Sequence, residues 1–313
     1  MKNEFSFIIP VYNEEKCIEE TLRNISDAAD GYSDDIEVIV VDAGSTDDSA
    51  GIASRIFATG TMNGRVLRFK KQTYPGAARN AGLKEAAYEN VIMLDSGVGI
   101  NKEMFLECAD KAKAYDFIWF RSEFVFKTST EPAYVRPYFV KRKQGRYLRH
   151  CCIRKDVIKQ LGGFREDLRA AEDWLFYREV AKNDFKEYFS DVSSSCQGFS
   201  GSLMGFYRKW TTYFEHSVYA GLHKRNLGMS IIQLLFIGIL FTAAITSGIN
   251  WLFALFCSGL IYMILRGLIS LWKSKIPSAG SMDILYTFIT SAVLEVARLA
   301  GVIRGLVKNA GKS

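Results

Sequence analysis

The sequence predicts an α/β fold built on a doubly wound, mostly parallel sheet, followed by a membrane-associated helical region. Two observations support this prediction. Between residues 5 and 94, short apolar segments that suit buried strands alternate with amphipathic segments that suit helices. Residues 226–265 are 40 consecutive positions without a charged side chain, twice the length of about 20 residues that one helix needs to cross a bilayer.

Charge is distributed unevenly along the 313 residues. Residues 1–196 contain 29 Lys and Arg against 31 Asp and Glu, whereas residues 197–313 contain 11 against 3. The positive charge therefore lies in the apolar third of the chain, which favours an anionic membrane surface over nucleic acid. No zinc-finger, helix-turn-helix or RNA-recognition pattern accompanies it. We expect membrane lipids, and no nucleic acid, among the partners.

Several predicted strands end at side chains that suit chemistry. The strand Phe5–Ile9 stops at Pro10, and the strand Ile36–Val41 ends at Asp42. The strand Val91–Leu94 ends at Asp95. Because the carboxyl ends of parallel strands face the ligand crevice of an open α/β sheet, these ends predict one ligand-binding edge.

Asp42 allows two interpretations. An ionised carboxylate only accepts hydrogen bonds, so it suits a ligand edge that offers N–H donors, such as the imide of a uracil. Alternatively, Asp42 only caps the following helix, with Gly44 permitting the tight turn. Both interpretations stay open at this level.

Two later segments carry charge in a pattern. Glu172 and Asp173 begin a helix that we expect to reach about Asn183, and acidic residues in a first turn also suit the helix dipole alone. Residues 136–149 form a basic segment, which is either a solvated loop or a contact for phosphates. Its six basic residues are Arg136, Lys141, Arg142, Lys143, Arg146 and Arg149.

With these residues in place, the chain resembles family 2 glycosyltransferases over about residues 5–180. The resemblance implies the GT-A fold, a Rossmann-like, mostly parallel sheet with helices on both faces. Six segments match in the family's order: Ile8–Glu14, Val41–Asp47, Gly76–Gly82, Leu94–Gly97, Gly162–Phe164 and Glu172–Asp173.

The resemblance implies a site for a nucleotide-diphospho-sugar, UDP-linked more often than GDP-linked. Asp42, with Ser45 beside it, would take the N–H of the base. Arg79 would lie near the diphosphate, where a guanidinium binds phosphate oxygens in bidentate fashion. Asp95 opens the family's D-x-D element, which holds the ribose and a divalent cation, Mg²⁺ or Mn²⁺. The pocket for base and ribose would be lined by Pro10, Val11, Tyr12 and Glu14.

The resemblance also implies an acceptor side. Asp173 would be the general base that takes a proton from the acceptor hydroxyl, a transfer worth roughly 10²–10⁴-fold in rate. Glu172 would belong to the same acceptor site. Attack from the far side of the anomeric carbon would invert its configuration.

Gly97 departs from the family pattern, because it replaces the second Asp of D-x-D. Three explanations are open. In the first, Asp95, the diphosphate and water hold the cation. In the second, cationic side chains, for example from residues 136–149, take the place of the cation. In the third, the chain is a non-catalytic nucleotide-sugar-binding relative with an assembly role. The intact nucleotide motifs and Glu172–Asp173 favour the first.

A second departure concerns the Q-x-x-R-W motif of processive members, which here keeps Arg208 and Trp210 but not the Gln. These two residues contact the diphosphate or the acceptor, or Trp210 lies at the bilayer interface instead. The missing Gln and a single hairpin favour transfer of one sugar over extrusion of a polymer. The chain thus resembles a membrane-anchored, bacterial or archaeal type of single-sugar transferase.

The C-terminal part predicts a membrane anchor. We expect a GT-A domain over 1–198, an interfacial helical linker over 199–227, two transmembrane helices within 228–270, and an amphipathic interfacial helix over 281–309. Basic residues flank both ends of the hairpin, so both ends and the catalytic domain should be cytosolic. This places the enzyme in the cytoplasmic (inner) membrane, multi-pass, with a lipid-linked acceptor. The last helix could also join protomers into a homo-oligomer, or cross the membrane with a buried Glu295–Arg298 pair.

Overall fold

The computed structural model describes residues 4–31, 36–137, 145–197, 202–248, 250–274, 276 and 280–311. Its contacts divide the chain into two compact units, which we describe separately. The first contains Met1–Val125 and Arg142–Gln197, and the second contains Phe126–Lys141 and Gly198–Ser313. We expected the first domain to end at residue 198, and the first unit ends at Gln197. Residues 126–141, however, which we expected in the first domain, pack with the second unit.

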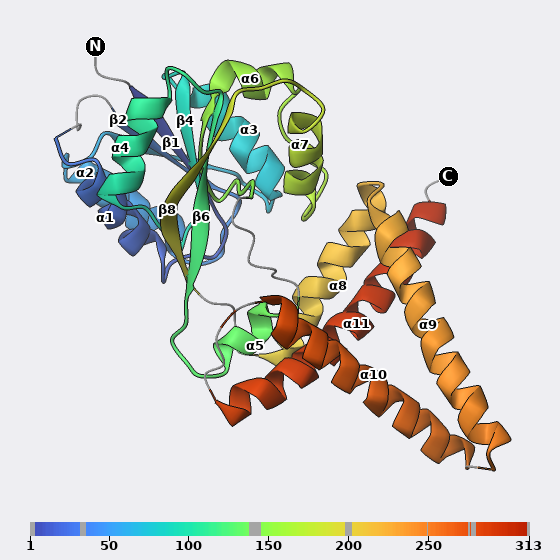
Figure 1. Ribbon diagram of the computed structural model, residues 1–313. Coiled ribbons are helices and arrows are strands. Elements are labelled where there is room, and N and C mark those ends of the chain that lie inside the picture. The colour runs from blue at the N-terminus through green and yellow to red at the C-terminus, as the bar shows by residue number, and fades with distance from the viewer. Residues whose placement is uncertain are drawn as a thin grey trace. The chain divides into compact units, whose positions relative to one another are not determined.

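The first unit is built on one eight-stranded sheet of order β3-β2-β1-β4-β7-β6-β8-β5 (Figure 1). The first four strands in this order are mutually parallel, and β6 pairs with β8 in parallel as well. Only β7 and β5 run antiparallel to their neighbours. The mostly parallel sheet is therefore confirmed. The strands are β1 Phe5–Val11, β2 Ile36–Asp42, β3 Gly64–Arg68, β4 Asn90–Leu94, β5 Val98–Gly99, β6 Phe117–Val125, β7 His150–Arg154 and β8 Glu187–Gln197.

Helices cover both faces of this sheet (Figure 1). Because successive side chains of a strand point to opposite faces, Phe7 and Ile9 join one buried core while Ile8 joins the other. The core of Phe7 includes residues of α1, α2 and α4, and the core of Ile8 includes residues of α3, α6 and α7. These helices are α1 Ile18–Ala28, α2 Ser49–Ala58, α3 Pro75–Glu85, α4 Lys102–Lys111, α6 Lys155–Gln160 and α7 Glu172–Val180.

The second unit is helical. Its helices are α5 Glu131–Val135, α8 Leu203–Tyr219, α9 His223–Thr246, α10 Trp251–Ser274 and α11 Ser281–Ala310. The backbones of α8 and α11 approach closely, because a Cβ added at Gly301 would lie 2.4 Å from the carbonyl oxygen of Thr211. A Cβ at Gly305 would likewise lie 2.7 Å from the Val218 side chain. Glycines spaced in this way let two helices pack at short distance.

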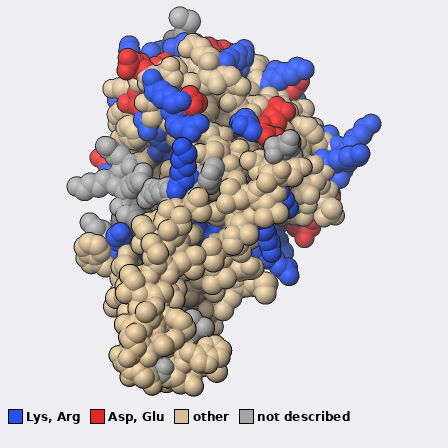
Figure 2. Space-filling model, turned by 90° about the vertical axis from the view of Figure 1, so that its right-hand side faces the viewer, with Lys and Arg blue, Asp and Glu red and all other residues tan. Residues whose placement is uncertain are grey.

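Three helices of this unit are long and apolar enough to cross a membrane: residues Asn226–Thr246, Trp251–Ser274 and Ser281–Ala310. The first two are largely exposed, and they cover most of the region 228–270 in which we expected two transmembrane helices. On the face that Figure 2 shows, the lower end of the molecule, where α9 and α10 meet, carries neither acidic nor basic side chains. An exposed, uncharged helical surface of this length suits a lipid environment.

The helix α11 turns its polar face toward the protein. Asp283, Thr287, Thr290 and Glu295 are fully buried, and Arg298 is nearly so. The apolar face is exposed instead, with Val296 and Val307 accessible at 58% and 67%. We expected an amphipathic helix with these two faces, but a helix at a bilayer surface usually shows its polar face to water. Here the neighbours α5, α8 and α10 supply partners for that polar face.

The segment that carries α5 is fixed to α11 by a buried ion pair. Nη1 of Arg136 lies 2.5 Å from Oδ1 of Asp283 and 3.0 Å from Oγ1 of Thr287, with both charged side chains fully buried. Thr290 donates to the carbonyl oxygen of Ala133 over 2.6 Å. These contacts explain why residues 126–141 belong to the helical unit although they interrupt the sheet sequence.

Candidate active site

The carboxylates Asp42 and Asp95 lie at one edge of the sheet. Asp42 ends β2, Asp95 follows β4, and both strands flank β1 in parallel. Neighbouring strands are separated by about 4.8 Å, so these two strand ends are about 10 Å apart. This is the edge at which the sequence predicts a ligand-binding site.

The loops that follow β1 and β2 are joined by hydrogen bonds. The backbone N–H of Asn13 donates to Ser45 Oγ over 2.9 Å, and Asn13 Oδ1 accepts from the N–H of Thr46 over 2.8 Å. The N–H of Glu14 donates to Ser49 Oγ over 2.8 Å. Asn13 itself has a positive φ of 58°, a conformation that Asn tolerates better than most residues. Ser45 therefore holds the two loops together.

Asp42 is a buried carboxylate, and only one of its oxygens accepts a hydrogen bond from the described residues. Its Oδ1 accepts the N–H of Ser45 over 2.8 Å. Its Oδ2 lies 3.2 Å from Nε of Arg68, but the angle is not that of a hydrogen bond, and Oδ2 has no such partner among the described residues. The helix α2 begins at Ser49, with Asp48 before it. The alternative in which Asp42 only caps that helix therefore does not fit the structure.

The residues expected around the base and ribose lie on the same edge. Pro10 and Val11 end β1, with Val11 in register with Asp42. Tyr12 and Glu14 follow in the loop that Ser45 and Ser49 hold. Tyr12 is half-buried, and its ring packs against the buried core that contains Ile8. This packing fixes the ring next to the same edge of the sheet.

Arg79 connects the two acidic segments of the site. From the buried first half of α3, its Nη1 donates to Glu172 over 2.8 Å and its Nη2 donates to Asp95 over 3.1 Å. The guanidinium also lies 5.8 Å from the ring centre of Phe164. A glycine precedes it at Gly76, where a Cβ would lie 2.0 Å from the carbonyl oxygen of Arg165. The small residues of this segment thus let α3 approach the segment before α7.

Asp173 stands at the start of α7 beside this cluster. Ala171 precedes the helix with a φ of 72°, which is unusual for a residue other than glycine and is often found at functional sites. Burial and the neighbouring Glu172 carboxylate raise the pKa of Asp173 to about 7, although Arg79 opposes the shift. A carboxylate with such a pKa can exchange a proton near neutral pH.

The loop after β4 offers one carboxylate to a divalent cation. Asp95 is 39% exposed, and Gly97, with a φ of 78°, supplies no side chain. The Ser96 hydroxyl is buried without a hydrogen-bond partner among the described residues. Within the described ranges, no three His, Cys, Asp or Glu side chains converge on a metal site. Because Mg²⁺ is often held by one or two carboxylates together with substrate phosphates and water, Asp95 fits a cation that arrives with a diphosphate.

The predicted basic segment 136–149 is not a single solvated surface. Arg136 is buried against Asp283, Arg146 forms two hydrogen bonds with Glu187 at 2.7 and 2.6 Å, and Arg149 lies over the rings of Phe124 and Tyr147. Lys141, Arg142 and Lys143 lie outside the described residues. The three arginines that are described therefore bind protein groups.

Arg208 and Trp210 belong to α8 in the second unit. Arg208 is exposed, whereas Trp210 packs against Phe206 and Phe214 of the same helix. The structure therefore brings Arg79, Asp95, Glu172 and Asp173 together, and it places Asp42 on the same sheet edge.

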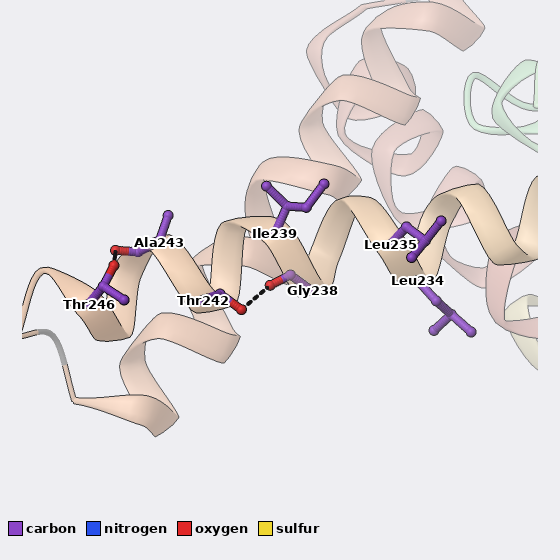
Figure 3. A pocket seen from close by; sticks show the side chains of 7 residues that line it. All are labelled: Leu234, Leu235, Gly238, Ile239, Thr242, Ala243 and Thr246. Atoms are coloured by element: carbon purple, nitrogen blue, oxygen red, sulfur yellow. Dashed lines mark hydrogen bonds between the residues drawn. The ribbon is translucent and has the colours of Figure 1, made fainter.

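The hollow in Figure 3 belongs to the second unit and includes none of the site residues named above. It is an open notch along α9, where Gly238 leaves space between larger side chains. The hydroxyls of Thr242 and Thr246 donate to backbone carbonyl oxygens of their own helix. The notch is lined by Leu234, Leu235, Gly238, Ile239, Thr242, Ala243 and Thr246, and it offers no charged group.

Two residues that lie at this edge of the sheet were not named as site residues in the sequence analysis. Asn13 fastens the loops after β1 and β2, and Arg68 ends β3 beside Asp42. A signal for Arg68 was available, because the end of a third parallel strand must lie at the same edge. Asn13 stands inside a matched segment, but its positive φ is visible only in the structure.

Comparison with known proteins agrees with this arrangement. The family model described as glycosyl transferase family 2 matches residues 6–167, just over half of the chain. The chain is 36% identical over 107 residues to poly(ribitol-phosphate) beta-N-acetylglucosaminyltransferase TarS of Staphylococcus aureus. That match covers 34% of this chain and 18% of the relative, so the chain spans less than a fifth of that protein. An undecaprenyl-phosphate 4-deoxy-4-formamido-L-arabinose transferase of Pseudomonas fluorescens is 33% identical over 91 residues, 29% of this chain and 27% of that one.

Solved structures share the fold. The mannosyltransferase PcManGT from Pyrobaculum calidifontis, in complex with GDP-Man and Mn²⁺, has a TM-score of 0.58 at 18% identity and covers 98% of this chain and 88% of its own. Residues 1–349 of Staphylococcus aureus TarS, in complex with UDP-GlcNAc, have a TM-score of 0.53 at 21% identity over 92% and 90% of the two chains. At these identities the likeness shows the GT-A fold alone.

Proposed function

Because this chain is a member of glycosyl transferase family 2, we propose that it transfers one sugar from a nucleotide-diphospho-sugar to an acceptor hydroxyl, with inversion at the anomeric carbon. The observation that carries the proposal is the cluster of Arg79, Asp95, Glu172 and Asp173 at the ligand edge of the sheet. It combines a proton acceptor that titrates near pH 7 with a carboxylate suited to a diphosphate-bound cation.

Asp42 would select the base of the donor. Its buried Oδ2 accepts no hydrogen bond from the described residues, so the N3–H of a uracil can satisfy it. Guanine also offers N–H donors, so the preference for UDP over GDP rests on TarS, a relative by sequence that is known in complex with UDP-GlcNAc. Pro10, Val11, Tyr12 and Glu14 would line the ribose and base, while Ser45 holds their loop.

Asp173 would act on the acceptor. As the acceptor oxygen forms its bond to the anomeric carbon, the bond from that carbon to the diphosphate breaks, and Asp173 receives the hydroxyl proton. Glu172 and Arg79 keep Asp173 in position, and Glu172 raises its proton affinity. Arg79 donates to Asp95 as well, so we propose that it orders the diphosphate side through Asp95.

A divalent cation bound to Asp95 and the diphosphate would supply positive charge for the leaving group. Mg²⁺ and Mn²⁺ both prefer such oxygen ligands. The PcManGT structure contains Mn²⁺, which supports a cation in this fold.

We propose that the helical unit anchors the protein in the cytoplasmic membrane with the GT-A unit in the cytosol. The α9–α10 hairpin would cross the bilayer, because basic residues flank both of its ends. The helix α11 meets the last third of α10 through the Ser270–Ser291 hydrogen bond of 2.9 Å, and its end pairs with α8 through Lys308 and Glu215 at 2.6 Å. An α11 that runs along α8 beside one end of the hairpin suits a position in the membrane surface.

An anchor of this kind favours a lipid-linked acceptor beside the bilayer. Arg208 and Trp210 would contact that acceptor or the diphosphate from α8. One relative by sequence is named for transfer to undecaprenyl phosphate. If the acceptor oxygen belonged to a phosphate, it would already be ionised, and Asp173 would orient it without taking a proton.

The test is release of nucleotide from a panel of UDP- and GDP-sugars, with Mg²⁺ or Mn²⁺ and total membrane lipid as acceptor source. We expect UDP release that requires lipid and falls at least 100-fold in Asp173→Asn, the lower end of a general-base effect. Tight donor binding without release under any condition would instead favour the non-catalytic assembly role that Gly97 leaves open. Failure to bind any nucleotide-sugar would contradict both functions.

A further inference from the structure

Two arginines of the helical unit share one carboxylate. Nη2 of Arg266, on α10, lies 2.6 Å from Oε1 of Glu295, and Nη1 of Arg298 lies 2.5 Å from its Oε2. The side chains are 16%, 1% and 11% exposed for Arg266, Glu295 and Arg298, so water screens this cluster weakly.

The cluster carries one positive charge in excess. Of the four acidic residues of the unit, Glu131 lies on α5 and accepts the N–H of Lys127. Residues 198–313 contain three acidic side chains: Glu215, Asp283 and Glu295. Glu215 pairs with Lys308 and Asp283 pairs with Arg136. Glu295 therefore serves both Arg266 and Arg298. An uncompensated charge at low exposure is costly, which indicates that an anion from outside the chain completes the cluster.

The surroundings of the cluster are those of a lipid surface. On α10, Leu265, Leu268 and Ile269 are exposed next to Arg266. Trp272, six residues further on, is 78% exposed, as a tryptophan at the membrane–water boundary would be. Six residues of helix are about 9 Å long, so an arginine side chain at 266 can reach the boundary where lipid phosphates lie.

Arg266 also retains capacity to bind an anion. Its Nη2 contacts Glu295, and 16% of the side chain remains exposed. A guanidinium offers five N–H donors in a planar fork that matches phosphate oxygens. Lysine in the same place would supply charge but not this geometry.

We propose that Arg266 and Arg298, with Glu295 between them, bind the phosphate of an anionic glycerophospholipid at the surface of the bilayer. The single excess charge matches the single negative charge of a phosphodiester. The site goes beyond the proposed glycosyl transfer, since it is formed by α10 and α11 and includes none of the donor-site residues. It requires only that the helical unit lies in a membrane.

The experiment measures binding of phosphatidylglycerol to the full-length protein in phosphatidylcholine nanodiscs by native mass spectrometry. We expect Arg266→Gln to lower the affinity about fivefold, since one basic residue near a membrane surface contributes on that scale. Arg266→Lys keeps most of the binding. Glu295→Gln, which raises the charge of the cluster, increases the affinity. The matched control is Arg304→Gln, an exposed arginine of α11 outside the cluster, and it leaves the affinity unchanged.

Several results would overturn the site. Equal losses in Arg266→Gln and Arg304→Gln would mean that only general surface charge attracts the lipid. A lower affinity in Glu295→Gln would mean that the cluster serves structure and not anion binding. Inorganic phosphate that competes with phosphatidylglycerol at equal concentration would identify free phosphate as the ligand. If Arg266→Gln fails to fold, the Arg266→Lys and Glu295→Gln pair still decides between these outcomes.

Discussion

Arg79 and Glu172 form a buried ion pair that joins two helices separated by 93 residues of sequence. The same guanidinium donates to Asp95, so one side chain holds the end of β4 and the start of α7. Because Arg79 lowers the proton affinity of Asp173 while Glu172 raises it, this pair controls both the position and the charge of the proposed base.

Replacement of Arg79 by Gln should therefore change rate and pH dependence together. Without the guanidinium, Asp173 stands among the carboxylates Glu172 and Asp95 with no counter-charge, and its pKa should rise above about 7. We expect lower nucleotide release at pH 7 and partial recovery at pH 8.5. Removing one partner of a buried pair should also lower the unfolding free energy by about 3–5 kcal/mol. A pH–rate profile with a parallel thermal melt tests both effects, and an unchanged midpoint would contradict the positioning role.

Asp173 should set the midpoint of the wild-type profile. A general base must be ionised, so the rate should rise with pH and level off above about 7, the pKa that burial and Glu172 give this group. Asp173→Asn should lose roughly 10²–10⁴-fold in rate and abolish this rise. If the variant keeps the rise, another group is the base.

The same pKa predicts a cost in stability. The folded pKa of Asp173 is raised above its value in the unfolded chain, 3.8, so the folded state binds the proton more tightly. Its contribution to stability is therefore fully present below pH 4 and is lost as the pH rises to about 7. We expect Asp173→Asn to melt at a higher temperature than wild type at pH 8, with little difference at pH 4.

Much of this site follows from local sequence. The buried segment Ile36–Val41 ended by Asp42 predicts both a parallel strand and the edge of the sheet at which it binds ligand. Apolar runs and strand-ending acids are short-range patterns, which the sequence displays directly. The hydrogen bonds of Arg79 cannot be predicted from a short-range pattern, because its partners Asp95 and Glu172 lie 16 and 93 residues away in the sequence. We expected this residue near a diphosphate and not as the tie between Asp95 and Glu172.

The helical unit shows a second limit. The spacing of Asp283, Glu295 and Arg298 correctly divides α11 into a polar and an apolar face. A helical period does not state which face meets protein and which meets solvent or lipid, and here the polar face is inside. The reason lies in Arg136, whose buried pairing with Asp283 spans 147 residues. The same long-range pairing moves residues 126–141 out of the domain in which the sequence predicted them.

Gly97 gives a prediction about the cation. A Cβ at this position would meet nothing closer than the Cys17 side chain at 3.8 Å, so Gly97→Asp fits sterically. The positive φ of 78° makes it mildly strained, although Asp tolerates this conformation better than most residues. We expect a lower Mn²⁺ concentration for half-maximal nucleotide release, because a second carboxylate would join Asp95. Gly97→Ala is the matched control, since it brings the strain without the ligand.

Arg136 and Asp283 predict how the 126–141 segment is retained. Because both side chains are fully buried, Arg136→Met should leave an unpaired carboxylate and cost about 3–5 kcal/mol, whereas the double variant Arg136→Met/Asp283→Leu should recover most of that loss. Lys308→Met provides the control, because Lys308 is 61% exposed in its pair with Glu215 and such pairs contribute about 0–1 kcal/mol. Thermal unfolding of the detergent-solubilised protein measures all three. Limited proteolysis within residues 126–145 should increase in the single variant alone. In the double variant no buried charge is left unbalanced, and Thr290 still bonds to Ala133, so the segment stays attached to α11. Equal losses in the single and double variants would mean that the packing around the pair, and not its charge balance, fixes this segment to α11.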